Sequence, residues 1–210
     1  MNEKIMNALQ LCVDKDDFAI PYEKQPFFYH FSDGRKVAVA TDGRIMLIVN
    51  KTDGLDLQEQ TKPNIEAVLK PCEYEQTITT AALKAALDKL PHLNYITEQC
   101  PECGGCGEVE WKYKNYVRDF CCPVCDGEGS IKKAGRQLDG HNCIDIGAAS
   151  IFGNLVESLV AVLDTLEITE IPCHAFNDRL CLANDDYHIT VMGMKVPDDG
   201  VVYDFKHYKL

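Results

Sequence analysis

Apolar positions near the start of the chain follow two different periods. Between residues 3 and 13 they recur at helical spacing, which predicts an amphipathic helix. Residues 27–31, 36–41 and 44–49 are instead rich in β-branched and aromatic side chains, and Asp33-Gly34 and Asp42-Gly43 separate them. Because Asp-Gly is the strongest short hairpin signal, this region predicts three antiparallel strands.

The same order of elements returns near the end of the chain. Residues 148–164 place a broad apolar stripe on one face of a predicted helix. Strands are then expected at 167–171, 179–183 and 187–194, separated by Asn-Asp turns. Between the two repeats, 77–90 predicts a strand and then a helix, with Thr79 or Thr80 as N-cap. The fold class predicted is therefore α+β, built from two helix-plus-meander repeats that pair their sheets and bury their helices.

Composition changes abruptly in the middle of the chain, where cysteine, glycine and aromatic residues become frequent. We therefore expect residues 97–138 to be an insertion into a body formed by 1–96 and 139–210. Its ends carry the same motif, C-x-x-C-x-G-x-G, and the overall frame is C-x2-C-x18-C-x2-C. That spacing is typical of a four-cysteine zinc site. A shell of four thiolates leaves no position for water or substrate, so the expected zinc, one per chain, is structural.

The zinc ligands expected are Cys100, Cys103, Cys122 and Cys125. Two further cysteines, Cys106 and Cys121, leave the choice open, because Cys121 adjoins Cys122 and could replace it in a shifted register. A disulfide pair or a redox C-x-x-C is the alternative chemistry for such a segment. The remaining cysteines lie in apolar surroundings and are expected to be small core residues.

Between the cysteine pairs, residues 109–120 alternate and predict a hairpin rich in aromatic residues. Its rings interleave with lysine and arginine, a combination that suits single-stranded nucleic acid. The simpler interpretation, which we favour, is an ordinary hairpin that packs its aromatic side chains on the body.

Charge and composition restrict the function classes. The chain of 210 residues has 33 acidic and 21 basic residues, a net charge of −12, which argues against general coating of nucleic acid. It contains no run of about 18 apolar residues, so no membrane partner is expected, and the first residues lack the apolar stretch of a signal peptide. A cytoplasmic location is the expectation. Phosphate loops, dinucleotide fingerprints, zinc-protease motifs and nucleophile elbows are missing, so the chain is expected not to be an enzyme.

Two resemblances add to this picture. The doubled C-x-x-C-x-G-x-G resembles one zinc module of the DnaJ-type cysteine-rich domain, which implies a zinc-held hairpin. Residues 39–46, Val-Ala-Thr-Asp-Gly-Arg-Ile-Met, resemble the A-T-D-G-H-R-L segment of the bacterial DNA polymerase sliding clamp (β-subunit) family. Residues 191–196, Val-Met-Gly-Met-Lys-Val, resemble the C-terminal V-M-P-M-R-L of the same family. The histidine after Gly43 is missing, and Gly193 stands where the family has proline.

The clamp resemblance implies a function. In that family several domains form a ring around duplex DNA, helices line the hole, and the two motifs build a pocket for short peptides of partner proteins. It implies a docking platform for replication or repair partner peptides, a homo-oligomeric ring and, through the ring, binding of double-stranded DNA. The alternative is a zinc-stabilised protein-interaction module, similar to a chaperone adaptor, without a DNA role. Carried over onto this sequence, the pocket residues are Thr41, Gly43, Arg44, Met192, Met194 and Lys195.

Overall fold

The computed structural model describes residues 2–14, 19–69, 72–139, 142–194 and 206–210. The chain divides into two compact units. Unit 1 comprises Met1–Leu90 and Gly140–Leu210, and unit 2 comprises Pro91–Asp139. Among the described residues, no helix has both the length and the apolar character needed to cross a bilayer.

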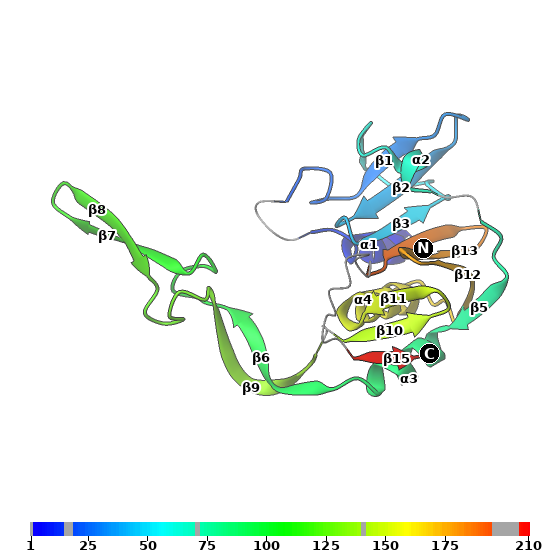
Figure 1. The fold of residues 1–210 in the computed structure, drawn as a ribbon. Helices are drawn as coiled ribbons and strands as arrows, with labels where there is room; N and C mark the ends of the chain where they lie inside the picture. Colours follow the sequence, from blue (N-terminus) through cyan, green and yellow to red (C-terminus); the bar gives the residue numbers. More distant parts are fainter. Residues whose placement is uncertain (1, 15–18, 70–71, 140–141, 195–205) are drawn as a thin grey trace. The chain divides into compact units, whose positions relative to one another are not determined.

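Unit 1 contains an eight-stranded sheet with the order β4-β1-β2-β3-β14-β13-β12-β5 (Figure 1). Four strands come from the first half of the chain: β1 (Phe27–His30), β2 (Lys36–Thr41), β3 (Ile45–Val49) and the short β4 (Gln58–Glu59). The others are β5 (Gln76–Thr79), β12 (Glu170–Phe176), β13 (Arg179–Ala183) and β14 (Tyr187–Met192). This confirms the predicted α+β class.

The two predicted meanders join at the centre of this sheet. Strand β3 pairs antiparallel with β14, with Leu47 opposite Ile189 and Ile45 opposite Val191. All four side chains are at most 2% exposed. The turns between strands follow the expected chemistry, because Gly34 and Gly43 both adopt positive φ, which costs glycine little. Two sequence repeats therefore form one continuous sheet rather than two.

Three helices pack together in unit 1: α1 (Asn2–Gln10), α3 (Thr80–Asp88) and α4 (Gly153–Thr165). Helix α4 contacts both of the others, and its face of Val156, Leu159 and Leu163 is fully buried. Thr79 is the N-cap of α3, since its hydroxyl accepts the amide of Ala82 at 3.1 Å. The fourth helix, α2 (Ile65–Val68), is short and lies beside β1 and β2 through the buried Ile65.

The predicted start of the last helix was wrong. The helix was expected from residue 148, but Cys143–Ile146 (β10) and Ala149–Phe152 (β11) form an antiparallel hairpin, and α4 begins at Gly153. Gly147 turns the hairpin at φ +58°. Ile144, Ile146 and Ile151 are buried here. An apolar run of this length fits a strand or a helix, so periodicity alone did not separate them. Strand β15 (His207–Lys209) pairs with β10 in parallel.

Unit 2 consists of two antiparallel ribbons. Strands β6 (His92–Gln99) and β9 (Ser130–Leu138) form one ribbon, and β7 (Glu108–Tyr113) and β8 (Tyr116–Cys121) form the other. The predicted hairpin is therefore present. Its aromatic side chains lie exposed and are not covered within their own unit. The buried core of unit 2 consists of Cys100, Cys122 and Cys125, with Cys103, Val109 and Ile131 packed against them.

Candidate metal centre and candidate peptide pocket

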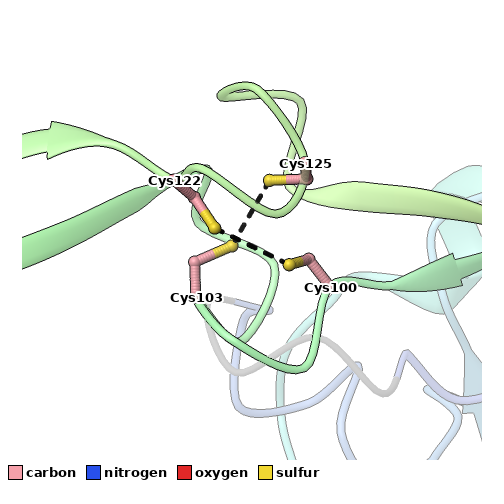
Figure 2. A group of neighbouring side chains, drawn as sticks. All are labelled: Cys100, Cys103, Cys122 and Cys125. Atoms are coloured by element: carbon pink, nitrogen blue, oxygen red, sulfur yellow. Dashed lines mark hydrogen bonds between the residues drawn. The ribbon is translucent and has the colours of Figure 1, made fainter.

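Four cysteines converge where the two ribbons of unit 2 meet (Figure 2). The sulfurs of Cys100, Cys103, Cys122 and Cys125 all lie within 4.8 Å of one another. Two of the separations, Cys100 to Cys122 and Cys103 to Cys125, are 3.8 Å. A disulfide requires about 2.05 Å. A zinc–sulfur bond of about 2.3 Å places tetrahedral sulfurs roughly 3.8 Å apart. The donor set and its spacing therefore fit a tetrahedral zinc ion.

The two cysteine motifs form matching loops. The amide of Gly107 donates to the Cys103 sulfur at 3.3 Å, and the amide of Gly129 donates to the Cys125 sulfur at 3.2 Å. The loops also bind each other reciprocally. Cys100 donates its amide to the carbonyl of Gly129, and Cys122 donates to that of Gly107, both at 2.8 Å. Such amide–sulfur bonds orient thiolate ligands and spread their charge.

Glycine is required at the end of each motif for a steric reason. Gly107 and Gly129 have φ of +78° and +71°. A Cβ added at Gly107 would lie 2.3 Å from the carbonyl oxygen of Gly127, and one at Gly129 would lie 2.3 Å from that of Gly105. The two C-x-x-C-x-G-x-G loops thus pack against each other in the same way, because the last glycine of each leaves room for the backbone of the other.

Burial and the backbone amides act in opposite directions on the pKa of these thiols. Burial raises the pKa of the Cys103 thiol, but hydrogen bonds with the amides of Gly107 and Gly105 and with the Cys100 and Cys125 side chains together outweigh it, so that the pKa falls to about 7. At Cys125 burial dominates and raises the pKa to about 12, against the opposing effect of the Gly129 amide. A metal ion that binds all four sulfurs must displace their protons, so its affinity increases with pH.

Cys106 and Cys121 lie outside this cluster. Both are exposed, and the sulfur of Cys106 is within 3.0 Å of the carbonyl oxygens of Cys103 and Glu108. The structure thus brings together the four residues named from spacing. Of the remaining cysteines, Cys12, Cys143, Cys173 and Cys181 are buried and Cys72 is partly buried.

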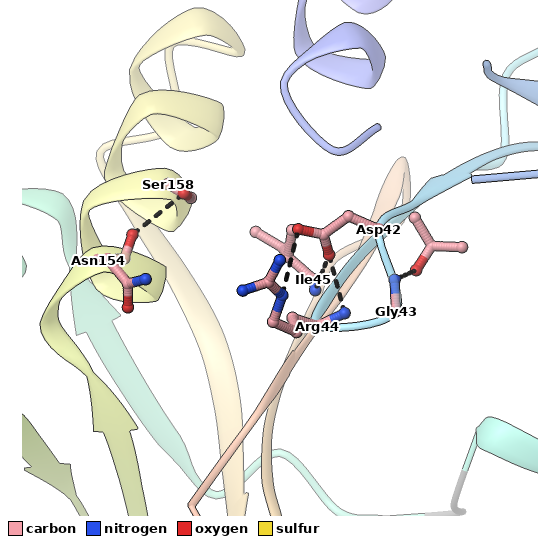
Figure 3. A network of polar contacts seen from close by, with 7 residues as sticks. Asp42, Gly43, Arg44, Ile45, Asn154 and Ser158 are labelled. Atoms are coloured by element: carbon pink, nitrogen blue, oxygen red, sulfur yellow. Dashed lines mark hydrogen bonds and ion pairs between the residues drawn. The ribbon is translucent and has the colours of Figure 1, made fainter. Parts of the chain in front are cut away.

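A second candidate site lies in unit 1, where the β2–β3 turn meets the end of β14. The turn is built by Asp42, whose carboxylate accepts the amides of Arg44 and Ile45 at 2.8 Å each (Figure 3). Thr41 accepts the amide of Gly43 at 3.0 Å. The amide of Met192 then donates to the carbonyl of Arg44 at 2.8 Å. This bond holds the two separate sequence motifs side by side.

A cavity of about 290 Å³ opens at this junction. Four of the six residues named from the clamp resemblance line it: Thr41, Gly43, Arg44 and Met192. Met194 is not a lining residue, and its amide instead donates to the carbonyl of Ser150 on β11 at 2.8 Å. Lys195 lies outside the described residues.

Sequence reasoning missed much of the cavity wall. Met46, Pro63, Ile65 and Val68 supply apolar surface from β3, the loop before α2 and α2 itself. Arg179 lies beside them with its side chain only 12% exposed. Its guanidinium donates to the Val68 carbonyl at 2.7 Å and to Asp178 at 2.9 Å. The sequence feature that could have indicated this part of the wall is Arg179 itself, a charged residue at the start of the otherwise apolar strand β13. The site is an apolar hollow with a paired cation in its wall and the exposed Arg44 at its rim.

One cluster has the residue types of a catalytic triad but not its geometry. The Ser150 hydroxyl donates to Asp145 at 2.6 Å, and His207 approaches the same carboxylate oxygen at 2.9 Å. A nucleophilic serine must instead give its proton to the histidine. Here the carboxylate lies between the two, and the contacts attach β15 and β11 to β10.

Unit 1 has the fold of a known class of proteins. Its sheet of paired meanders with packed helices is a sliding-clamp fold. No protein-family model matches the sequence, and no curated protein matches it. Similar solved structures include the DNA polymerase III subunit beta of Borrelia burgdorferi, solved with a natural product (9% identity, TM-score 0.53, 93% of this chain and 62% of that one). The sliding clamp of Bartonella birtlesii, solved bound to griselimycin, is also similar (10% identity, TM-score 0.50, 93% and 64%). The chain spans less than two thirds of the length of these clamps.

Proposed function

We propose that the protein is a non-catalytic docking platform of the sliding-clamp type that binds short peptides of replication or repair proteins. The observation that carries this proposal is the cavity at the β2–β3 turn and the end of β14. In a chain with a clamp fold, the two segments that resemble the clamp peptide-pocket motifs meet there through the Met192–Arg44 bond. An apolar hollow with a flexible methionine and a few polar groups suits varied apolar side chains.

Calorimetric titration tests this function directly. A short peptide that binds bacterial sliding clamps is expected to bind the full chain at a single saturable site, and griselimycin, to which the Bartonella birtlesii clamp is bound, is expected to displace it. Native mass spectrometry of the same sample is expected to show a homo-oligomer with one zinc per chain. A chain that binds neither ligand would exclude the docking role.

A second candidate function is a docking platform that does not encircle DNA, and the charge of the helices in unit 1 favours it. Over α1, α3 and α4, the described residues include two lysines and four carboxylates. Lys4 pairs with Glu167 at 2.5 Å and Lys84 with Asp164 at 2.8 Å. Binding to duplex DNA relies on an excess of unpaired cations facing the phosphates. The helices of clamps face the hole of the ring. The helices of this chain carry a net negative charge, which disfavours the passage of duplex DNA beside them.

We further propose that unit 2 is an insertion, predicted as 97–138, whose structure depends on zinc held by Cys100, Cys103, Cys122 and Cys125. Support comes from the sulfur spacing and the two matching amide–sulfur bonds. The ion would be structural, because four sulfurs complete its shell. The resemblance to the DnaJ-type zinc module concerns these two loops alone, and we do not propose a chaperone activity from it.

The loop design predicts a difference between two glycine substitutions. Gly104→Ala and Gly129→Ala both place alanine at positive φ, +61° and +71°, so both incur backbone strain of about 1–2 kcal/mol. Only Gly129→Ala also drives a Cβ into the Gly105 carbonyl, since nothing lies within 4 Å of the position at Gly104. We expect Gly129→Ala to lower zinc affinity at least roughly tenfold more than Gly104→Ala. Competition with a chromophoric chelator measures both, and equal losses would contradict the steric argument.

A further inference from the structure

The β7–β8 hairpin presents a surface that neither zinc nor peptide docking uses. Its register places Val109 opposite Phe120, Trp111 opposite Arg118, and Tyr113 opposite Tyr116. Because paired residues and alternate positions share one side of a ribbon, these six side chains form a single face, called here the aromatic face. Its four rings are 51–73% exposed. Large rings are seldom left this exposed together without a partner.

The rings are arranged as a stacking surface. Trp111 and Tyr113 are near parallel, with ring centroids 5.8 Å apart and planes inclined at 15°. Phe120 meets Trp111 edge-on at 6.5 Å. Together with Val109, Cys121 and Pro123, Trp111 and Phe120 line an open hollow of about 430 Å³. Flat exposed rings beside an open hollow can accept another planar ring without rearrangement of the hairpin.

Charge is segregated between the two sides of the hairpin. The aromatic face has one charged residue, Arg118, and Lys114 in the adjoining turn lies with its ammonium 5.4 Å from the Tyr113 ring. The carboxylates of residues 108–121 all lie on the opposite side: Glu108, Glu110 and Asp119. Lys112 is on that side as well and pairs with Glu110 at 2.6 Å. The aromatic face is therefore cationic, although the whole chain is acidic.

We propose that the aromatic face binds single-stranded nucleic acid. Unpaired bases stack on Trp111 and Tyr113, and Arg118 contacts the phosphate backbone. Aromatic side chains with interspersed cations are the usual means of binding single strands without strong sequence preference. A protein partner could also contact the rings. The position of all three carboxylates on the opposite side gives an apolar partner no advantage, but it spares a polyanion their electrostatic repulsion. Duplex DNA offers no unpaired base to stack. Residues 91–139 contain six basic against eight acidic residues, so unit 2 also lacks the excess of cations that duplex binding requires.

Trp111 makes the test direct, because it is the only tryptophan in the protein. Oligothymidylate titrated into the full, zinc-loaded chain is expected to quench tryptophan fluorescence in a saturable, salt-dependent manner, and the matched duplex is expected to leave it unchanged. With fluorescein-labelled strand and anisotropy as readout, Trp111→Ala is expected to weaken binding roughly 5- to 150-fold, the range for loss of one stacked base.

A charge-matched pair of variants separates this face from general electrostatics. Arg118→Ala is expected to reduce the slope of log affinity against log salt by about 0.7, as for the loss of one single-strand phosphate contact. Lys112→Ala removes the same charge from the opposite side and is expected to leave the slope unchanged. Equal effects of the two variants, equal binding of duplex and single strand, or no quenching by a chain with full zinc occupancy would each overturn the proposal. The cavity in unit 1 is untouched by these variants, so peptide docking is tested independently.

Discussion

Cys103→Ser is expected to release the metal and to unfold residues 91–139 while unit 1 stays folded. Unit 2 has little else to hold it together. Its buried core consists of three cysteines, with Cys103, Val109 and Ile131 against them, and its two ribbons have two strands each. Isolated two-stranded ribbons are marginal in water. Structural zinc contributes apparent binding free energies of about 10–16 kcal/mol in small zinc-dependent folds, so its loss removes the main stabilising contribution.

Cys106→Ser is the matched control for this prediction. It makes the same chemical change three residues further along, at an exposed sulfur outside the cluster. Native mass spectrometry gives the metal content of both variants, and hydrogen exchange gives the protection of each unit. The variant at Cys106 is expected to match the unaltered protein in both. Full zinc occupancy and unchanged protection of residues 91–139 in Cys103→Ser would remove Cys103 from the ligand set.

Met192→Asp is expected to weaken peptide binding by roughly a hundredfold or more without unfolding the protein. Met192 ends β14 at the junction of the two motifs, and its side chain is partly exposed and lines the cavity. A carboxylate there would be desolvated against Met46 and Ile65 when a peptide binds, at a cost of several kcal/mol. Loss of a central interface side chain alone costs about 2 kcal/mol or more. The hydrogen bond from the residue 192 amide to the Arg44 carbonyl involves backbone atoms alone, so it can form with methionine or with aspartate at this position.

Met194→Asp is the control, because it makes the same change two residues away at a side chain outside the cavity lining. Its peptide affinity is expected to stay within about threefold of the unaltered protein, by the ordinary size of surface substitutions. Calorimetry measures binding, and thermal unfolding verifies that both variants are folded. If the Met194 variant lost binding and the Met192 variant did not, the peptide site would lie beyond the end of β14.

The meanders and the cysteine cluster were accessible from sequence because each rests on local chemistry. Asp33-Gly34 and Asp42-Gly43 fix tight turns between apolar runs. The doubled C-x-x-C spacing specifies which four sulfurs can converge, and the structure brings them within 4.8 Å of one another. Such signals need only a few neighbouring residues, so no knowledge of the tertiary structure was required.

The rest of the site depends on contacts between distant segments. Ile65, Val68 and Arg179 share one cavity wall although more than a hundred residues separate Val68 from Arg179. No local pattern encodes that meeting. The β10–β11 hairpin was missed for a different reason, because buried strands and buried helices have similar apolar content. The aromatic hairpin itself was predicted from its alternating pattern, and the packing of its rings on the body stays a prediction, since within unit 2 both Trp111 and Tyr116 are left exposed.

Hydrogen–deuterium exchange with and without a saturating clamp-binding peptide tests the docking claim most directly, because it locates the bound peptide along the chain. We expect increased protection in the segments that line the cavity, residues 41–46, 63–68 and 190–192. Residues 91–139 are expected to exchange as before. Protection confined to residues 91–139, or binding without protection at 41–46 and 190–192, would contradict the assignment of this cavity as the docking site.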